Sequence, residues 1–325
     1  MQARQAFIAA HGGPDVIKWH DVDLSAPGPG EVLMEIRTVG LNFIDTYHRS
    51  GLYPLPLPAA IGSESAGVVV AVGPGVKDFA PGDRVGHCGG TRGDYATARL
   101  VPARELFDLP LDIDFTTAAA VMMKGATTEF LAERAATMIE GDYALVHAAA
   151  GGVGQLLVQW LTTNGINVIA TAGSQAKLDI ALQCGATHAF LTDDPDLATK
   201  VRAVTGGTGV PVIYDGVGAA TWDISLQCAA RRGLIVSYGN ASGAVTGVAL
   251  GQLTAHGSLF VTRPTMGDYY TTPEERAAGI SRLWAMLRSG HVKVTVGQTF
   301  PLADVAEAHR AIEARETVGS TVLVV

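Results

Sequence analysis

The chain has 325 residues, of which 48% are hydrophobic and only 17% are charged, and its formal net charge is −8. This apolar content suffices for two packed domains and excludes a disordered chain. The negative balance, without a Lys/Arg run, disfavours nucleic acid and anionic membranes as partners. Three widely separated cysteines indicate a reducing, cytoplasmic environment rather than a disulfide framework, and no apolar run is long enough to cross a membrane.

The first third of the chain has the pattern of a β-rich domain. Short apolar or alternating runs, typical of strands, occur at residues 6–9, 32–39, 67–72 and 95–101. Pro- and Gly-containing turns separate these runs at residues 27–30, 73–75 and 81–83. Short strands at this spacing predict a compact barrel or sandwich.

A regular alternation of strands and helices follows. Asp114 is expected to cap a helix from Phe115 that is interrupted at Lys124-Gly125 and resumes over residues 127–138. Six strands are then predicted at residues 143–147, 167–171, 188–190, 210–215, 234–238 and 259–262. Helices are predicted between them at residues 152–163, 174–184, 195–204 and 220–230. This order predicts an α/β fold with a doubly wound, six-stranded parallel sheet.

The tail of the chain departs from that alternation. Thr272 to Glu275 form a capping box with a proline at the first helical position. The helix that it opens is followed by a strand at 292–300, a helix at 303–314 and a strand at 321–325. We expect the tail to return to the first domain, which gives one domain of residues 1–124 and 266–325 and an inserted domain of residues 125–265.

The strongest local motif lies between the first strand of the alternation and its helix. Residues 147–154 read His-Ala-Ala-Ala-Gly-Gly-Val-Gly. A pyrophosphate at the start of such a helix meets free N–H groups and the positive end of the helix dipole. Ala149 replaces the first glycine of the usual G-x-G-x-x-G pattern, but the strand–turn–helix context still predicts a dinucleotide site.

The end of the second strand indicates which dinucleotide binds. NAD sites place Asp or Glu there to bind the ribose 2′-hydroxyl, whereas residues 170–177 contain no carboxylate. Ser174 could bond a 2′-phosphate and Lys177 could neutralise it, which favours NADPH over NADH. The alternative is that Lys177 is only a solvated helix residue.

Two further strand ends carry glycines beside polar residues, at 214–218 and 237–243. Ligands of doubly wound sheets lie at the carboxyl ends of the strands, so we expect both segments near the nicotinamide half of the cofactor. No metal site is expected, because Cys88, Cys184 and Cys228 are isolated and only His87 lies beside one of them.

Taken together, these motifs resemble the medium-chain dehydrogenase/reductase superfamily, and within it the zinc-free, ζ-crystallin-like NADPH:quinone reductases. The resemblance covers essentially the whole chain and is most specific at residues 42–53, 73–85, 148–154, 238–243 and 261–264. Zinc-dependent relatives carry Cys where this chain has Asn42, and Gly-His-Glu where it has Gly62-Ser63-Glu64. Both replacements remove a ligand, so the resemblance also implies catalysis without metal.

The resemblance implies a GroES-like catalytic domain around a Rossmann domain, with NADPH in the cleft between them. It assigns the following residues to cofactor binding: Asn42, Thr46, Lys124, Thr128, Gly151, Gly152, Val153, Gly173, Ser174, Lys177, Gly216, Val217, Tyr238, Gly239, Asn240, Arg263 and Pro264. The chain departs from its bacterial relatives at Thr192 and Phe130, where tyrosine is common. Both departures remove a hydroxyl group and are expected to weaken NADPH binding.

The expected reaction is hydride transfer from NADPH to a small electron-poor acceptor such as a quinone. Candidate helpers are Asn42 as a hydrogen-bond donor and Tyr47 and Tyr53 as polar walls, although each tyrosine could equally be a packing residue. One alternative is reduction of α,β-unsaturated ketones, aldehydes or enoyl thioesters, in which Tyr47 would matter more as an acid. A second alternative is an NADPH-binding protein with little turnover. A homodimer is expected, paired through the strand at 259–262.

Overall fold

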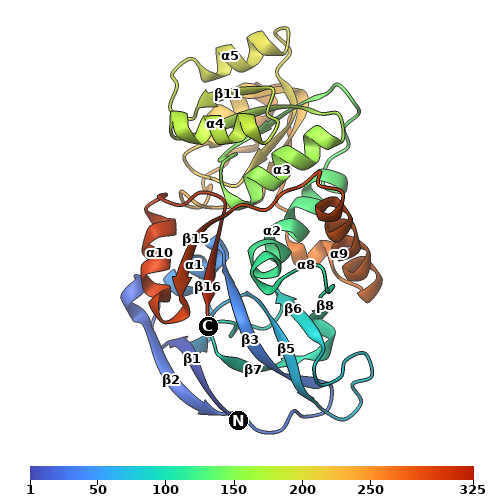
Figure 1. The fold of residues 1–325 in the computed structure, drawn as a ribbon. Helices are drawn as coiled ribbons and strands as arrows, with labels where there is room; N and C mark the ends of the chain where they lie inside the picture. Colours follow the sequence, from blue (N-terminus) through green and yellow to red (C-terminus); the bar gives the residue numbers. More distant parts are fainter. The chain divides into compact units, whose positions relative to one another are not determined.

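The computed structural model describes residues 1–325, and the chain divides into two units (Figure 1). The first unit combines Met1–Lys124 with Val294–Val325, and the second unit is Gly125–Lys293. The first unit is therefore built from both ends of the chain.

A seven-stranded sheet forms most of the first unit. Its strands are, in sheet order, β15 (Val296–Pro301), β16 (Ser320–Val324), β3 (Glu31–Leu41), β5 (Glu64–Val72), β6 (Arg84–Cys88) and β8 (Leu106–Asp108), with β7 (Ala98–Pro102) paired to β3. The long strand β3 is the centre of this sheet, because it pairs antiparallel with β5, β7 and β16. Met34 and Ile36 of β3 are buried in the same core cluster as Val85 of β6 and Leu323 of β16.

A second, smaller sheet completes the β-rich part of this unit. It contains β2 (Ile17–Asp23), β1 (Gln2–Ile8) and β4 (Ala59–Ala60). The unit also has helices α1 (Phe43–Ser50) and α10 (Val305–Glu313) and the 3₁₀ turns η1 (Pro14–Val16), η2 (Ala103–Glu105) and η3 (Leu302–Asp304). The predicted β-rich character is confirmed, although β2, β4, β6, β8 and α1 were not predicted as elements.

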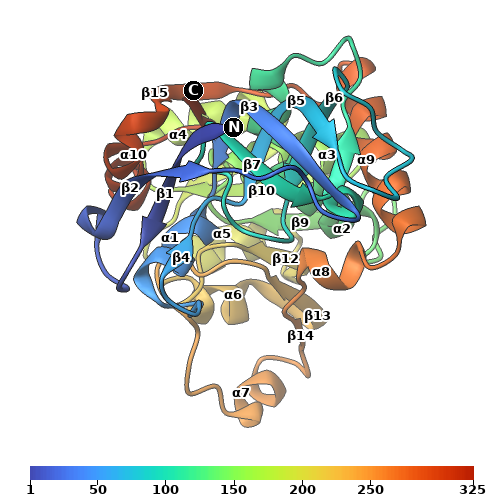
Figure 2. The ribbon, with the colours of Figure 1, turned by 90° about the horizontal axis from the view of Figure 1, so that it is seen from below.

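Six parallel strands form the centre of the second unit. In sheet order they are β11 (His188–Leu191), β10 (Asn167–Ala172), β9 (Tyr143–Val146), β12 (Val210–Asp215), β13 (Ala229–Ser237) and β14 (Phe260–Thr262). The connecting helices are α3 (Gly152–Thr163), α4 (Gln175–Gln183), α5 (Leu197–Val204), α6 (Trp222–Cys228) and α7 (Leu250–Ala255), the last on a projecting segment between β13 and β14 (Figure 2). Leu145, Ile169 and Ile213 are fully buried on neighbouring strands. This architecture confirms the predicted doubly wound sheet.

Helix α2 (Phe115–Glu133) differs from its prediction at two places. It passes through Lys124 and Gly125 without a break. Gly125 is a packing residue rather than a helix end, because a Cβ added there would lie 2.5 Å from Cδ1 of Leu283. The helix also ends before residue 138, since the N–H groups of Arg134 and Ala135 both donate to the carbonyl of Phe130. Its start is as expected, with Asp114 accepting from the Thr117 N–H at 2.7 Å.

Helices α8 (Met266–Tyr269) and α9 (Pro273–Arg288) belong to the second unit, whereas the sequence assigned residues from 266 onward to the first domain. The capping box at the start of α9 is present, with Thr272 Oγ1 accepting from the Glu275 N–H at 3.2 Å. Two side-chain bonds hold this segment beside the end of α2, Tyr270 to Glu129 at 2.9 Å and Arg282 to Glu133 at 2.7 Å. The chain therefore re-enters the first unit only at Val294.

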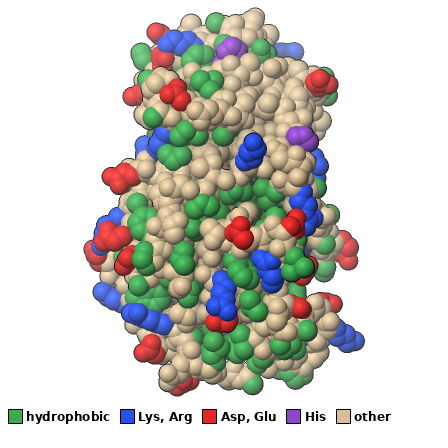
Figure 3. Space-filling model, in the orientation of Figure 1, with side chains coloured by type: hydrophobic (Ala, Val, Ile, Leu, Met, Phe, Trp, Pro, Cys, Tyr) green, Lys and Arg blue, Asp and Glu red, His purple; other side chains and the backbone are tan.

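The surface carries mixed charge and one notable group of exposed apolar residues. Lys and Arg side chains are interspersed with Asp and Glu on the face drawn in Figure 3. Leu250 of α7 is 79% exposed, and Phe260 and Val261 of β14 are 56% and 40% exposed. None of the helices is long and apolar enough to span a bilayer.

Candidate active site

The turn from β9 to α3 is shaped by close contacts of its backbone. Ala148 has a left-handed φ of 51°, and the Gly151 N–H donates back to the Ala148 carbonyl at 3.0 Å. A Cβ on Gly154 would lie 2.4 Å from that same carbonyl oxygen, so only glycine lets the first turn of α3 pack here. The N–H groups of Gly152 and Val153, in the first turn of α3, have no acceptor within the helix. No side chain caps this helix either. The turn can bind an anion through its backbone.

Three predicted cofactor residues follow the end of β10. Ser174 is the N-cap residue of α4, and both Ser174 and Gly173 are exposed. Lys177 lies one turn into α4 and its N–H donates to the Ser174 carbonyl at 3.1 Å. Thr192 is close by, since its N–H donates to the Ala172 carbonyl at 2.9 Å. The strand end thus presents a hydroxyl and a cation without a carboxylate.

The ends of β12, β13 and β14 bring most of the other predicted residues of this unit together. Backbones approach closely there, because a Cβ on Gly239 would lie 2.2 Å from the Gly216 carbonyl oxygen. Arg263 reaches across from β14 and donates to the carbonyls of Ser237 and Gly239, at 2.6 and 3.2 Å. The other predicted residues in these loops are Val217, Tyr238, Asn240 and Pro264.

A buried polar network fixes these loops and was not predicted. Asp215, at the end of β12, accepts from the N–H groups of Val217 and Gly218 at 2.8 and 3.0 Å. Ser225 joins Asp215 to His147, whose other ring nitrogen lies 2.8 Å from Thr171 Oγ1. Burial lowers the pKa of His147, so its imidazole is a neutral link between β9, β10 and β12. A polar residue at each strand end was the only sequence signal for this network.

In the first unit, the candidate site centres on a fully buried carboxylate, Glu64. Its Oε2 accepts from Asn42 Nδ2 at 2.7 Å and from Lys124 Nζ at 3.3 Å, and its Oε1 accepts from the Met123 N–H at 2.7 Å. Gly40 makes room for this cluster, because a Cβ there would lie 2.2 Å from Glu64 Oε2. Glu64 therefore orients two predicted site residues, Asn42 and Lys124. It follows directly after Ser63 in the motif where a metal ligand is absent, which was the only signal for it.

A second buried carboxylate, Asp45, supports the start of α1. It accepts from the Asn42 N–H at 2.9 Å and from Ser63 Oγ at 2.6 Å. Burial raises the pKa of Asp45 to about 6, against the lowering effect of these hydrogen bonds and of one from Tyr95. Tyr95 in turn lies 3.0 Å from Nε2 of His309, whose pKa burial lowers to about 3.

The two candidate tyrosines lie against each other at the end of α1. The rings of Tyr47 and Tyr53 meet edge to face with centroids 5.2 Å apart, and the Tyr53 N–H donates to the Tyr47 carbonyl at 3.1 Å. Gly51 permits this reversal with its φ of 88°. Tyr47 is buried and Tyr53 is half-buried, while Thr46 donates its hydroxyl to the Phe43 carbonyl at 2.8 Å. Asn42 at the start of α1, Tyr47 on it and Tyr53 just after its end thus place an amide and two aromatic rings in one short segment.

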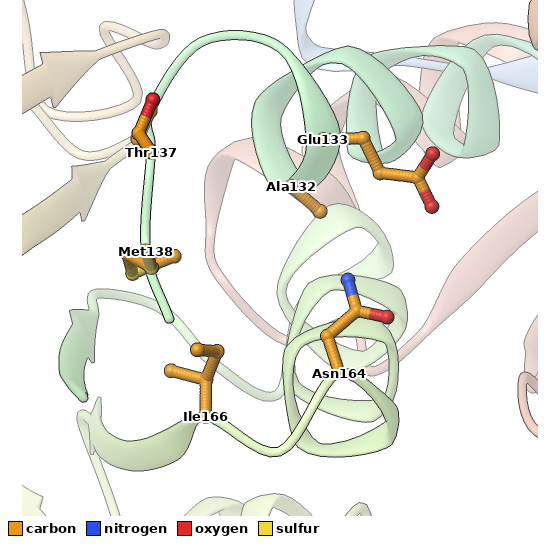
Figure 4. A pocket seen from close by; sticks show the side chains of 7 residues that line it. Ala132, Glu133, Thr137, Met138, Asn164 and Ile166 are labelled. Atoms are coloured by element: carbon orange, nitrogen blue, oxygen red, sulfur yellow. The ribbon is translucent and has the colours of Figure 1, made fainter. Parts of the chain in front are cut away.

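Several other observations bear on the predicted site. Thr128 is fully buried in α2, and Phe130 stacks on Tyr269 with centroids 4.6 Å apart. No group of three or more His, Cys, Asp and Glu side chains is arranged to hold a metal ion. The surface hollow in Figure 4 is lined by Glu133, Met138, Asn164 and their neighbours, and it contains none of the predicted site residues.

Comparison with known proteins places these features in a family. Residues 28–111 match the alcohol dehydrogenase GroES-like domain, and residues 152–279 match the zinc-binding dehydrogenase domain. A quinone oxidoreductase from Pseudomonas aeruginosa is 47% identical over 99% of both chains. A 2-haloacrylate reductase from a Burkholderia species is 40% identical over 98% of both chains.

Solved structures agree with these sequence matches. The crystal structure of Escherichia coli quinone oxidoreductase complexed with NADPH matches with a TM-score of 0.97 and 42% identity. The match covers 99% of this chain and all of the other chain. The similarity therefore extends over both units.

Proposed function

The chain belongs to the quinone oxidoreductases of the medium-chain dehydrogenase/reductase superfamily, and from this we propose that it is an NADPH-dependent quinone reductase. The observation that carries the proposal is the uncapped, glycine-lined turn between β9 and α3, followed by a strand end with Ser174 and Lys177 and no acid. Such a turn binds pyrophosphate through its backbone, and the second strand end suits a 2′-phosphate.

The residues present fit this cofactor. When bound, NADPH supplies the hydride. Gly151, Gly152 and Val153 would hold the pyrophosphate, with the backbone N–H groups of Gly152 and Val153 as the donors, because the Gly151 N–H already donates to the Ala148 carbonyl. Gly173, Ser174 and Lys177 would bind the adenosine ribose phosphate. The other predicted residues keep their proposed roles. Those that would line the rest of the cofactor are Gly216, Val217, Tyr238, Gly239, Asn240, Arg263 and Pro264. Those that would lie near its nicotinamide are Asn42, Thr46, Lys124 and Thr128.

On the substrate side, the chain's own residues position and shield the acceptor. Glu64 holds the Asn42 amide in one orientation, so that Asn42 can bind a substrate or nicotinamide oxygen without first reordering its side chain. Tyr47 and Tyr53 provide an apolar wall with polar edges. A reduced quinone is a delocalised oxyanion that can take its proton from water, so the reaction does not require a protein acid.

The main alternative is reduction of α,β-unsaturated compounds, which the match to a 2-haloacrylate reductase favours. Those reactions protonate carbon after hydride addition, so Tyr47 would matter as an acid. We expect Tyr47→Phe to change kcat by less than about twofold with a quinone. A loss of more than about tenfold confined to an enone would favour the alternative. Tight NADPH binding with neither acceptor turned over would favour a binding protein.

We also propose that the protein is a homodimer paired through β14. The sheet of the second unit ends at this strand, whose outer edge pairs with no other strand. Phe260 and Val261 on that edge are exposed, as is Leu250 on the neighbouring projecting helix. Pairing with a second copy would cover both the open edge and these apolar side chains.

A cytoplasmic location is part of the same proposal. Cys88, Cys184 and Cys228 form no disulfide, and Cys88 and Cys228 are buried. Cysteines that form no disulfides are typical of reducing compartments. Fractionation of cells with an antibody against the protein tests this location, and recovery with an extracytoplasmic fraction would contradict it.

A further inference from the structure

Arg92, in the loop between β6 and β7, is a half-buried arginine that makes no ion pair. Its Nη1 donates to the Gly90 carbonyl, and its other nitrogens lie beside one imidazole, with Nε 3.3 Å from Nδ1 and Nη2 3.3 Å from Nε2 of His48. Arg99, which follows in the chain, is instead paired with Asp94 at 2.9 Å. The guanidinium of Arg92 thus keeps unused N–H donors.

No group around Arg92 forms an ion pair with it. Burial and the charge of Arg92 lower the pKa of His48 to about 4, so this imidazole is uncharged at neutral pH. The acidic groups that act on Arg92 at longer range are Asp45, Asp94 and Glu105. Each accepts its short hydrogen bonds from other residues, Asp45 from Ser63, Asp94 from Arg99 and Glu105 from Thr91, so none of them occupies an N–H donor of the Arg92 guanidinium.

Arg92 is linked to the candidate substrate residues through ring contacts. His48 follows Tyr47 on α1, and the His48 ring is 6.2 Å from the ring of Tyr53. Tyr53 contacts Tyr47 in turn, at 5.2 Å. A molecule whose ring rests on these tyrosines could therefore place a short side chain at the guanidinium.

We propose that Arg92, backed by His48, is an anion subsite that selects acceptors carrying a carboxylate on a short side chain. The planar guanidinium fork matches a carboxylate with two parallel hydrogen bonds, which are stronger in a partly desolvated position than in water. The inference rests on the proposed reductase function and adds a substrate class to it.

A matched pair of quinones tests this proposal. A trimethyl-1,4-benzoquinone with a propionate side chain and its methyl ester differ only in charge, and their fully substituted rings resist addition of thiols. We expect the wild-type protein to have the higher kcat/KM with the acid. Arg92→Met should lower the acid-to-ester ratio by about 10- to 100-fold, mainly through KM, and leave the KM for NADPH unchanged.

Two further variants distinguish the role of the Arg92 guanidinium from a folding defect and from a general loss of positive charge. Arg92→Lys keeps the charge without the fork and should give an intermediate ratio, which also covers the case that Arg92→Met folds poorly. Arg37→Met removes the same charge from an exposed residue of β3 and should keep the wild-type ratio. An unchanged ratio in Arg92→Met, or a raised KM for NADPH instead, would overturn the proposal.

Measuring both turnover and binding of the quinones distinguishes failure of the anion subsite from failure of the proposed reductase function. If the ester is reduced but Arg92→Met does not alter the ratio, only the anion subsite fails. If neither quinone is reduced, the reductase function fails, and quenching of protein fluorescence by the acid decides the subsite alone. Tighter binding of the acid than of the ester, lost in Arg92→Met, would support the subsite, and equal binding would reject it.

Discussion

Single buried carboxylates organise the first unit's part of the candidate site. Glu64 accepts hydrogen bonds from the Asn42 amide, the Lys124 ammonium and a backbone N–H. Asp45 accepts them from the Ser63 hydroxyl and from the N–H of Asn42, the N-cap residue of α1. The sequence could place Asn42 and Lys124 in the site through their motifs. It could not show that Glu64 joins them, because these residues are distant in sequence and only the pairing of β3 with β5 and the packing of α2 bring them together.

The raised pKa of Asp45 predicts a pH dependence of stability. Its pKa is about 6 in the folded chain, against 3.8 as the ordinary value. As the pH rises between these values, the unfolded chain releases a proton that the folded chain retains, so the free energy of unfolding falls by about 3 kcal/mol. The stabilising contribution of Asp45 is fully present below pH 3.8, and the free energy of unfolding falls no further from this source above pH about 6.

Urea unfolding of Asp45→Asn across this pH window checks the expectation. Asparagine cannot ionise, so the wild-type protein should lose about 3 kcal/mol relative to the variant as the pH rises through the window. Asp78→Asn, at an exposed position, should follow the wild-type profile. Parallel profiles for Asp45→Asn and wild type would show that Asp45 titrates alike in both states.

At the scale of elements, the second unit was predicted better than the first. The bounds of α3 and β12 agree with the sequence prediction, because each strand and helix there has a clear periodicity and glycine ends. Helix α1 was missed because it has only eight residues and follows β3 directly, so its capping bonds matter more than its periodicity. The break predicted in α2 was wrong because Gly125 serves packing with Leu283 and does not end the helix.

The turn at Gly154 provides a prediction for one element. In Gly154→Ala the new methyl group would lie 2.4 Å from the Ala148 carbonyl oxygen and 2.8 Å from backbone atoms of Ala149, so the turn must move. We expect a loss of about 1–3 kcal/mol in stability and at least a roughly tenfold rise in the Kd for NADPH, measured by calorimetry.

A matched glycine serves as the control for this substitution. Gly251, in α7, has no atom within 4 Å of an added Cβ. Gly251→Ala should leave NADPH binding unchanged and keep or slightly increase stability. Normal NADPH binding by Gly154→Ala would mean that this turn is not the pyrophosphate site.

At the scale of the whole molecule, the sequence predicted two kinds of architecture, and the chain divides into two compact units after Lys124 and after Lys293. Helices α8 and α9 lie in the second unit, where side-chain bonds to α2 hold them. Those bonds join residues more than a hundred positions apart, which a pattern along the chain does not reveal.

The proposed dimer also belongs to this scale. Phe260→Lys places a charge on the open edge at a side chain that is 56% exposed, so the folded chain should tolerate it while pairing is lost. Sedimentation equilibrium should give a dimer mass for the wild type and a monomer mass for this variant. Leu111→Lys, at an apolar position that is 88% exposed in the other unit, should remain dimeric. A monomeric wild type, or a dimeric Phe260→Lys, would contradict pairing through β14.

The most direct test of the central claim is the consumption of NADPH, followed by its near-ultraviolet absorbance, by chelator-treated protein offered 1,4-benzoquinone. A simple enone as acceptor and NADH as donor are the comparisons. We predict rapid quinone-dependent oxidation of NADPH that survives chelation and greatly exceeds the rate with NADH. Oxidation only with the enone, equal use of NADH, or loss of activity on chelation would contradict an NADPH-dependent quinone reductase that works without metal.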